Sequence, residues 1–267
     1  MNFELKVIMQ IGRSLPPLPH VTGIINRILK PFYLRKQRED VLADVMGNKM
    51  MLTPSECVDG GLLFYPQLYE RQEIAYIKEN LKQGDVFLDV GSNIGFYSLV
   101  ASLKVLQTGL VLAVEADPEN YGKLIRNIEI NHIENIQAVN VGVSDKKESL
   151  RLGINTTGNR GGNSFISESP EFVEVECLPL LDILTSTGVK SIQGAKFDIE
   201  GFEYKVLKQF FEDADQSLYP NFIITEYNPE MVKHSEGNVM ELLLAQGYKI
   251  QHEFLDNKIF IKSRQQG

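Results

Sequence analysis

The feature that most constrains the fold of this chain is an alternation of short apolar runs with segments of helical periodicity. The apolar runs have the length of buried strands and lie at residues 86–90, 110–116, 136–143, 195–199 and 222–227. Apolar residues at helical spacing follow at 96–105, 118–131, 203–211 and 238–246. Strands that alternate with helices predict βαβ units, and therefore an α/β fold around a mostly parallel sheet.

Residues 146–178 interrupt this alternation, and residues 249–262 end it. Residues 249–254 and 258–262 flank Leu255-Asp256-Asn257 and predict an antiparallel C-terminal hairpin at one edge of the sheet. Residues 146–178 contain two extended segments around a loop rich in Gly and Asn. We interpret this segment as an insertion over the carboxyl edge of the sheet.

The N-terminal quarter of the chain shows no such rhythm. Residues 1–66 contain six prolines with short apolar runs between them, which predicts an irregular N-terminal extension. A helix is predicted over residues 68–82, where Ile74, Ile77 and Leu81 are spaced by three or four. One domain at 67–267, with the insertion, therefore accounts for the periodic part of the chain.

Composition argues against several classes of protein. The 27 basic and 35 acidic residues give a net charge of −8, whereas a general nucleic-acid binder needs a basic face for phosphates. Cys57 and Cys177 lie far apart, which argues against a disulfide framework or a cysteine zinc site. We find no signal peptide and no transmembrane segment of about 18 apolar residues, so a cytoplasmic protein is expected. The amphipathic stretch 15–30 is expected to pack on its own domain, with a membrane surface or a partner as the alternative.

The first strand delivers a glycine-bearing turn to the edge where open parallel sheets bind ligands. Asp89 lies at the strand end, and Gly91 and Gly95 allow the backbone to turn sharply and approach a ligand. A dinucleotide fingerprint would have a third glycine, and the acid would repel an anionic pyrophosphate. A cationic ligand fits this turn better.

Two more acids extend the pattern. Glu115 follows the second strand, where a carboxylate suits the two ribose hydroxyls, and Asp145 follows the third strand, where it can face an adenine amino group. Asp145 has the alternative role of capping its own turn. With Asp89, these residues predict a site for an adenosine that carries a positive charge, which is S-adenosylmethionine.

Further motifs support this prediction. The most specific is Lys-Phe-Asp-Ile-Glu-Gly-Phe-Glu, and the others lie at residues 84–95, 113–118, 163–165, 180–184 and 223–226. With these motifs, residues 64–227 resemble the FkbM family of S-adenosylmethionine-dependent methyltransferases. The resemblance implies a Rossmann-like seven-stranded sheet and transfer of a methyl group, usually to an oxygen of a sugar or a secondary metabolite. It also implies that the cofactor is held by Asp89, Gly91, Asn93, Gly95 and Glu115.

Acidic residues gather after the fourth strand. Asp198 and Glu200 share one face because side chains alternate along an extended chain, and Glu203 follows one helical turn later. We predict that Asp198 is the base or orienting group for the acceptor hydroxyl, with Glu200 as the second catalytic candidate. Glu203 is expected to cap the next helix. A divalent cation held by Asp198, Glu200 and Glu226 is an alternative, although no metal site is predicted.

Two loops carry weaker candidates. Arg160, Asn163 and Ser164 lie in the Gly-rich loop at 156–164, which could cover the acceptor or be a flexible surface loop. His234 follows the fifth strand and is read as a surface histidine, with a catalytic base as the alternative.

The sequence thus predicts a methyltransferase that acts on a hydroxyl group of a sugar or secondary metabolite. The expected partner is a small-molecule or carbohydrate acceptor, with no nucleic acid. One alternative is a nicotinamide-dependent oxidoreductase, which the missing third glycine disfavours. The other is a non-catalytic module that binds S-adenosylmethionine.

Overall fold

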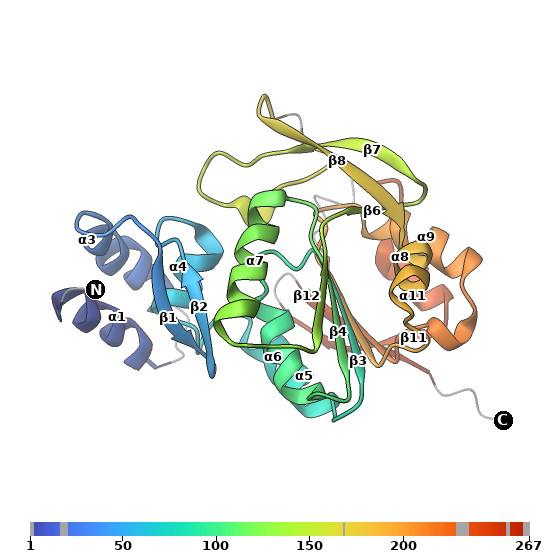
Figure 1. Ribbon diagram of the computed structural model, residues 1–267, viewed down its shortest axis with the longest axis horizontal. Helices are drawn as coiled ribbons and strands as arrows, with labels where there is room; N and C mark the ends of the chain where they lie inside the picture. The colour runs from blue at the N-terminus through green and yellow to red at the C-terminus, as the bar shows by residue number, and fades with distance from the viewer. Residues whose placement is uncertain (1–2, 17–20, 168, 228–234, 255–256, 264–267) are drawn as a thin grey trace.

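A computed structural model describes residues 3–16, 21–167, 169–227, 235–254 and 257–263 of the chain (Figure 1). Its centre is a seven-stranded sheet with the order β11-β12-β10-β9-β3-β4-β5. All pairings are parallel except the two that β12 makes with β10 and β11. The strands are β3 (Val86–Val90), β4 (Leu110–Val114), β5 (Ile136–Val139), β9 (Gly194–Phe197), β10 (Phe222–Glu226), β11 (Tyr248–Glu253) and β12 (Asn257–Lys262). The α/β prediction, with its antiparallel C-terminal hairpin, is confirmed.

Helices cover both faces of this sheet (Figure 1). The helices are α5 (Arg71–Asn80), α6 (Phe96–Val105), α7 (Pro118–Ile130), α8 (Leu180–Thr187), α9 (Glu203–Asp213) and α11 (Val239–Ala245). Alternate residues of one strand enter different cores, because Phe87 packs on the side of α5 and α6, whereas Leu88 packs on the side of α8, α9 and α11. Asp117 caps α7 as its position predicts, and its Oδ1 accepts a hydrogen bond from the Glu119 N–H at 2.9 Å. No helix in the described ranges is long and apolar enough to cross a membrane.

The chain order of the strands defines where a ligand can enter. The chain runs from β3 through β4 to β5, and then returns to form β9 on the other side of β3. The connections after β3 and β9 therefore diverge to opposite sides, which leaves a crevice at the carboxyl ends of these two strands. Such a switch point is the usual binding position in an open α/β sheet.

The N-terminal extension is not irregular, which corrects the expectation from its prolines. Its described part forms α1 (Phe3–Ser14), α2 (Val21–Ile24), the π-helical turn η1 (Ile25–Leu29), α3 (Lys30–Leu34), the hairpin β1 (Val41–Val45) and β2 (Asn48–Leu52), and α4 (Cys57–Phe64). Pro31 lies in the first turn of α3, and Pro54 and Pro66 lie in the turns before and after α4. Proline is compatible with a first helical turn and with connections, so these residues separate the elements rather than prevent them.

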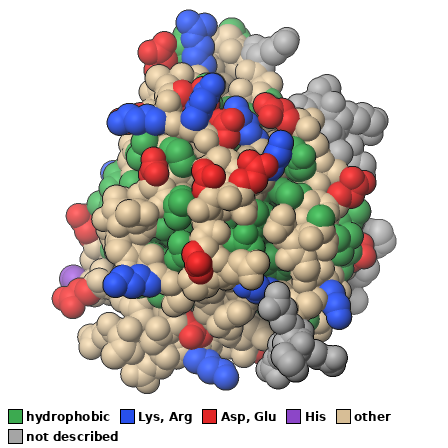
Figure 2. Space-filling model, turned by 90° about the vertical axis from the view of Figure 1, so that its right-hand side faces the viewer, with side chains coloured by type: hydrophobic (Ala, Val, Ile, Leu, Met, Phe, Trp, Pro, Cys, Tyr) green, Lys and Arg blue, Asp and Glu red, His purple; other side chains and the backbone are tan. Residues whose placement is uncertain are grey.

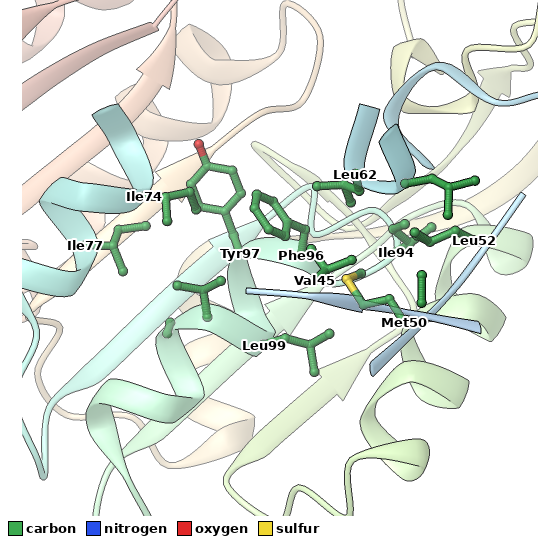
Figure 3. Packing of buried hydrophobic residues seen from close by; sticks show 14 of the residues in the cluster. Val45, Met50, Leu52, Leu62, Ile74, Ile77, Ile94, Phe96, Tyr97 and Leu99 are labelled. Carbon is green, nitrogen blue, oxygen red and sulfur yellow. The ribbon is translucent and has the colours of Figure 1, made fainter. Parts of the chain in front are cut away.

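The hairpin and α4 share a core with the helices of the main sheet. Val45, Met50 and Leu62 are almost completely buried, and they belong to the same cluster as Phe96 and Leu99 of α6 (Figure 3). Burial of this apolar surface attaches the N-terminal region to one face of the sheet. We retain the division into residues 1–66 and 67–267 as a proposal.

The insertion forms a small sheet of its own. β6 (Gly142–Ser144), β7 (Glu148–Gly153) and β8 (Phe172–Pro179) pair in the order β6-β8-β7, so both predicted extended segments of the insertion are strands. The predicted third strand at 136–143 is split into β5 and β6. The Asn140 side chain donates hydrogen bonds to the carbonyl groups of Glu115 at 2.8 Å and Ala116 at 3.2 Å, at the point where the pairing of β5 with β4 ends.

Candidate cofactor and acceptor site

Asp89 lies near the end of β3, is completely buried, and lines the larger of two cavities at this edge, with a volume of about 710 Å³. The Ser98 hydroxyl donates a hydrogen bond to Asp89 Oδ2 at 2.5 Å. Asp89 Oδ1 has no hydrogen-bond partner in the described part of the protein. Burial raises the pKa of Asp89, and the ammonium group of Lys196 opposes this shift. Because a buried acceptor without a donor is costly, Oδ1 calls for a ligand that supplies an N–H group or a positive charge.

Gly91 and Gly95 are required by the close packing of the loop after β3. Both have left-handed backbone angles, with φ of +78° and +90°. A Cβ atom on Gly91 would lie 1.9 Å from the carbonyl oxygen of Asp198, and one on Gly95 would lie 2.5 Å from the Leu124 side chain. The two glycines therefore let the loop lie directly against the end of β9 and against α7.

Glu115 follows β4, and both of its carboxylate oxygens accept backbone hydrogen bonds. The donors are the N–H groups of Asn93 at 2.7 Å and Asp117 at 2.9 Å. Burial raises the pKa of Glu115 to about 7, although these two bonds favour the charged form. The side chain lines the smaller cavity, about 50 Å³ in volume, beside the apolar Val141 and Val143. Each carboxylate oxygen keeps a second acceptor position, which suits two ribose hydroxyls.

Asp145 is not brought to this site. Its carboxylate accepts a hydrogen bond from the Ser144 hydroxyl at 3.1 Å and forms an ion pair with Lys205 of α9 at 3.2 Å. It does not line either cavity. The reason is the break at Asn140, because β6 leaves the main sheet and carries Asp145 toward α9.

Asp198, Glu200 and Glu226 meet where β9 and β10 end. One carboxylate oxygen from each residue lies within 4.8 Å of the other two, and all three residues line the larger cavity with Asp89. Burial, and then the charges of Asp198 and Glu226, raise the pKa of Glu200 to about 8. Glu200 has a left-handed φ of +52°, a strained conformation of the kind that occurs at functional sites. The other candidate base, His234, lies outside the described residues.

Lys196 balances these acids, although no role is predicted for it from its motif. It lies on β9, is 4% exposed, and donates a hydrogen bond from Nζ to Asp198 Oδ2 at 2.6 Å. Nζ also lies 4.6 Å from the centroid of the Tyr97 ring. Although burial acts in the opposite direction, the charges of Asp198 and Glu70 hold the pKa of Lys196 above its ordinary value. The ammonium group therefore stays charged and pairs with Asp198, so it would compete with a divalent cation for that side chain.

Glu70 is a second residue of the site that has no sequence signal. It immediately precedes α5, has a left-handed φ of +42°, and lines the larger cavity. Burial raises the pKa of Glu70 to about 7, and Lys196 opposes the shift. The interaction between Glu70 and Lys196 joins positions far apart in the chain, so no local spacing could reveal it.

Glu203 stabilises the turn that carries Glu200. Its carboxylate accepts hydrogen bonds from the N–H groups of Ile199 at 2.8 Å and Gly201 at 3.0 Å. Glu203 is buried and is the first residue of α9. This geometry supports a structural capping role for Glu203, in keeping with its expected place at a helix start.

The loop around Arg160 is anchored at the start of α7. Arg160 Nη2 and Asn163 Nδ2 both contact Asp117 Oδ2, at 2.8 Å and 2.7 Å. The Arg160 N–H also donates to Glu56 Oε2 at 3.1 Å. Gly161 of this loop lines both cavities. The loop therefore covers the side expected for adenosine as well as the larger cavity.

Comparison with known proteins gives a family match and several related proteins. The sequence pattern described as the Methyltransferase FkbM domain matches residues 89–250, which is more than half of the chain. The methyltransferase sdnD of Sordaria araneosa is 26% identical over 205 residues, covering 65% of this chain and 77% of that protein. The hexuronic acid methyltransferase AglP of Haloferax volcanii is 26% identical over 157 residues, covering 59% of this chain and 62% of that protein. The solved FkbM methyltransferase from Methylobacillus flagellatus superposes with a TM-score of 0.43 at 15% identity, over 96% of this chain and 57% of that chain.

The sheet order and the family pattern define a Rossmann-like methyltransferase. The chain belongs to the FkbM methyltransferase family. This membership implies S-adenosylmethionine as the methyl donor, and the residues present fit that group. In the described part of the protein, Asp89 Oδ1 is a buried acceptor without a donor, and the ammonium group of such a ligand would supply one.

Proposed function

We propose that this protein transfers a methyl group from S-adenosylmethionine to a hydroxyl oxygen of a sugar or another hydroxylated metabolite. The observation that carries the proposal is that the unpartnered Asp89 Oδ1 and the acids Asp198 and Glu200 line one cavity. When bound, the cofactor supplies an electrophilic methyl group on a sulfonium. The cavity thus offers both a place for a cationic donor and carboxylates for an acceptor hydroxyl.

The residues proposed to hold the cofactor lie at the ends of β3 and β4 and in the loop that follows β3. Asp89 receives the ammonium group, Glu115 receives the ribose hydroxyls, and Gly91, Asn93 and Gly95 bring the backbone close. The cavity beside Glu115 is about 50 Å³, well below the roughly 300 Å³ at which ligand pockets begin. Entry of the adenosine therefore requires the loop anchored by the Arg160 side chain to move outward.

The two catalytic candidates take different roles in this proposal. Asp198 is held in place by the hydrogen bond from Lys196 Nζ and orients the acceptor hydroxyl. Glu200, with its raised pKa, accepts the hydroxyl proton as the new C–O bond forms and the C–S bond breaks. Because the leaving thioether is neutral, positioning of the two reactants supplies most of the rate gain.

The lining of the larger cavity supports a polyhydroxylated acceptor. Arg71, Gln72, Glu73 and Asn257 line it together with the acids, so hydrogen-bonding groups are available beside the apolar side chains of the wall. The name of the relative AglP states that it methylates a hexuronic acid. A sugar that carries a carboxylate is therefore the first acceptor to test, with Arg71 as a cationic partner.

The direct test combines a binding and a transfer measurement. Calorimetry with S-adenosylmethionine, S-adenosylhomocysteine and NAD should show binding of the first two, and binding of NAD alone would favour the oxidoreductase. S-adenosylhomocysteine release is then followed with uronic acids, neutral sugars, nucleotide sugars and RNA, and the product is examined by NMR for an O-methyl singlet. Transfer to RNA would contradict the acceptor class, and binding without any transfer would favour a non-catalytic module. The variant Asp198→Asn then separates the two measurements, because it should lose methyl transfer but keep its affinity for the cofactor.

A further inference from the structure

Helix α1 carries apolar side chains on two different faces. Leu5 and Ile8 are buried against the rest of the protein. Phe3, Val7 and Ile11 recur every four residues along another face and are 78%, 41% and 45% exposed. A surface helix that packs with one face normally has a polar outer face. The second apolar stripe of α1 is therefore not explained by the packing of the domain.

A second stripe with the same spacing runs along the next helical segment. Ile24, Ile28 and Phe32 are 52%, 63% and 50% exposed and span α2, η1 and α3. An ion pair between Glu4 and Lys36 connects α1 to the end of this segment, and the Lys36 ammonium lies 5.4 Å from the centroid of the Phe32 ring. The six side chains, Phe3, Val7, Ile11, Ile24, Ile28 and Phe32, lie on the helices at the left end of Figure 1, and we call them the N-terminal apolar stripes.

The charge of this end is opposite to that of the rest of the chain. Residues 1–38 contain seven basic residues and one acidic residue, Glu4, whereas the remaining 229 residues contain 20 basic and 34 acidic residues. The exposed basic residues of the described helices and the turn after them are Lys6, Arg27, Arg35, Lys36 and Arg38. Basic and acidic side chains are mixed on the face that Figure 2 shows, which belongs to the opposite end of the molecule. An occupant of the N-terminal end is therefore expected to be both apolar and anionic.

We propose that the N-terminal helices dock the protein on a lipid bilayer with anionic headgroups. The apolar stripes would enter the boundary between headgroups and acyl chains, and the basic side chains would contact lipid phosphates. Arg27 lies between Ile24 and Ile28 in the sequence, so burial of this stripe in a protein interface would desolvate a charge. Cores of protein interfaces are depleted of charged residues, whereas long basic side chains reach from a bilayer boundary to water.

Docking in this way would place the larger cavity near the bilayer. Thr22 of α2 lines that cavity, as do Cys57 and Val58 of α4. If the proposed function holds, the acceptor is presented at a membrane surface, for instance as a sugar attached to a lipid. This consequence rests on the proposed function, but docking itself does not.

The experiment measures binding of the full chain to vesicles by flotation, without any activity assay. Vesicles of phosphatidylcholine with 30 mol% phosphatidylglycerol should bind the protein at least about tenfold better than phosphatidylcholine alone. Arg27→Gln with Arg35→Gln should lower the partition coefficient about 25-fold, since each basic residue near an anionic surface contributes about fivefold. Phe3→Gln with Ile28→Gln should lower it by at least about tenfold.

A matched control uses exposed leucines of α6 and α11, outside the N-terminal helices. Leu103→Gln with Leu244→Gln changes side chains that are 47% and 44% exposed, and should leave vesicle binding within about twofold. Circular dichroism melting and calorimetry with S-adenosylmethionine establish that each variant is folded. The proposal is overturned if the wild type does not bind anionic vesicles. It is equally overturned if the variant Phe3→Gln with Ile28→Gln binds them as tightly as the wild type does. It is also overturned if the wild type is a dimer that this variant converts to a monomer, because the stripes would then be an interface between copies.

Discussion

Two pairs of acids stand at the carboxyl edge of the sheet, and their surroundings differ. Asp89 and Glu115 are buried, and their partners are a hydroxyl group and backbone N–H groups. Asp198 and Glu200 are partly exposed, lie close to Glu226, and are balanced by the Lys196 ammonium. Neutral donors hold the first pair in place, although the Lys196 ammonium also acts on Asp89, whereas the second pair lies among other charged side chains, which raise the pKa of Glu200. We infer that the first pair binds the cofactor and the second pair carries the chemistry.

The largest effect is expected when the proposed base is removed. Glu200→Gln should lower kcat by about 10²- to 10⁴-fold, because proton transfer by a positioned side chain contributes about that much. Affinity for S-adenosylmethionine, measured by calorimetry, should stay within about twofold. An unchanged kcat would assign the proton to another group.

The same variant should change the pH dependence. Glu200 accepts a proton only as a carboxylate, and its pKa is raised to about 8, so kcat/KM of the wild type should rise with pH until about 8 and then level off. The rising limb should disappear in Glu200→Gln. A wild-type rate that is flat between pH 6 and 9 would argue against this base.

The next largest effect is expected from loss of the ammonium group that balances the second pair. Lys196→Met should lower the free energy of unfolding by about 3–5 kcal/mol, because it leaves the buried Asp89 and the partly exposed Asp198 without their counter-charge. Urea denaturation at pH 7 measures this loss. The exposed Lys190 offers the control, and Lys190→Met should change the free energy by less than about 0.5 kcal/mol.

A smaller and more selective effect is expected at the first pair. Asp89→Asn should weaken S-adenosylmethionine binding by about 10- to 150-fold, the equivalent of the roughly 1.5–3 kcal/mol of one charged hydrogen bond. Calorimetry measures the dissociation constant, with Asp182→Asn as a control outside both cavities. Equal affinities of the two variants for S-adenosylmethionine would show that Asp89 does not bind the cofactor.

The smallest effect is expected for the acid that the structure places elsewhere. Asp145→Asn should change cofactor affinity by less than about twofold, because its carboxylate pairs with Lys205 and lines neither cavity. A loss comparable to that of Asp89→Asn would return Asp145 to the adenosine site. It would also mean that β6 moves when the cofactor binds.

Much of the site could be predicted because parallel strands end at one edge. Asp198 and Glu200 follow β9, and Glu226 ends the neighbouring strand β10, so the strand ends alone predict that the three acids meet. Lys196 is part of the Lys-Phe-Asp-Ile-Glu-Gly-Phe-Glu motif. Its interaction with the acids depends on its burial, which the sequence of a single strand does not reveal. Glu70 gave no signal, since its contact with the site is formed only when α5 packs beside α6.

The sequence by itself determined the βαβ order, the glycine loop after β3 and the acids at the strand ends, because hydrophobic periodicity and backbone preference are local properties. Tertiary structure alone decided that prolines in the N-terminal region separate helices, that Asn140 turns the third strand out of the sheet, and that the buried Lys196 pairs with Asp198. These outcomes depend on burial and on contacts between distant residues. Such terms arise only when the chain is packed, because the charge state and partner of a side chain follow from what surrounds it.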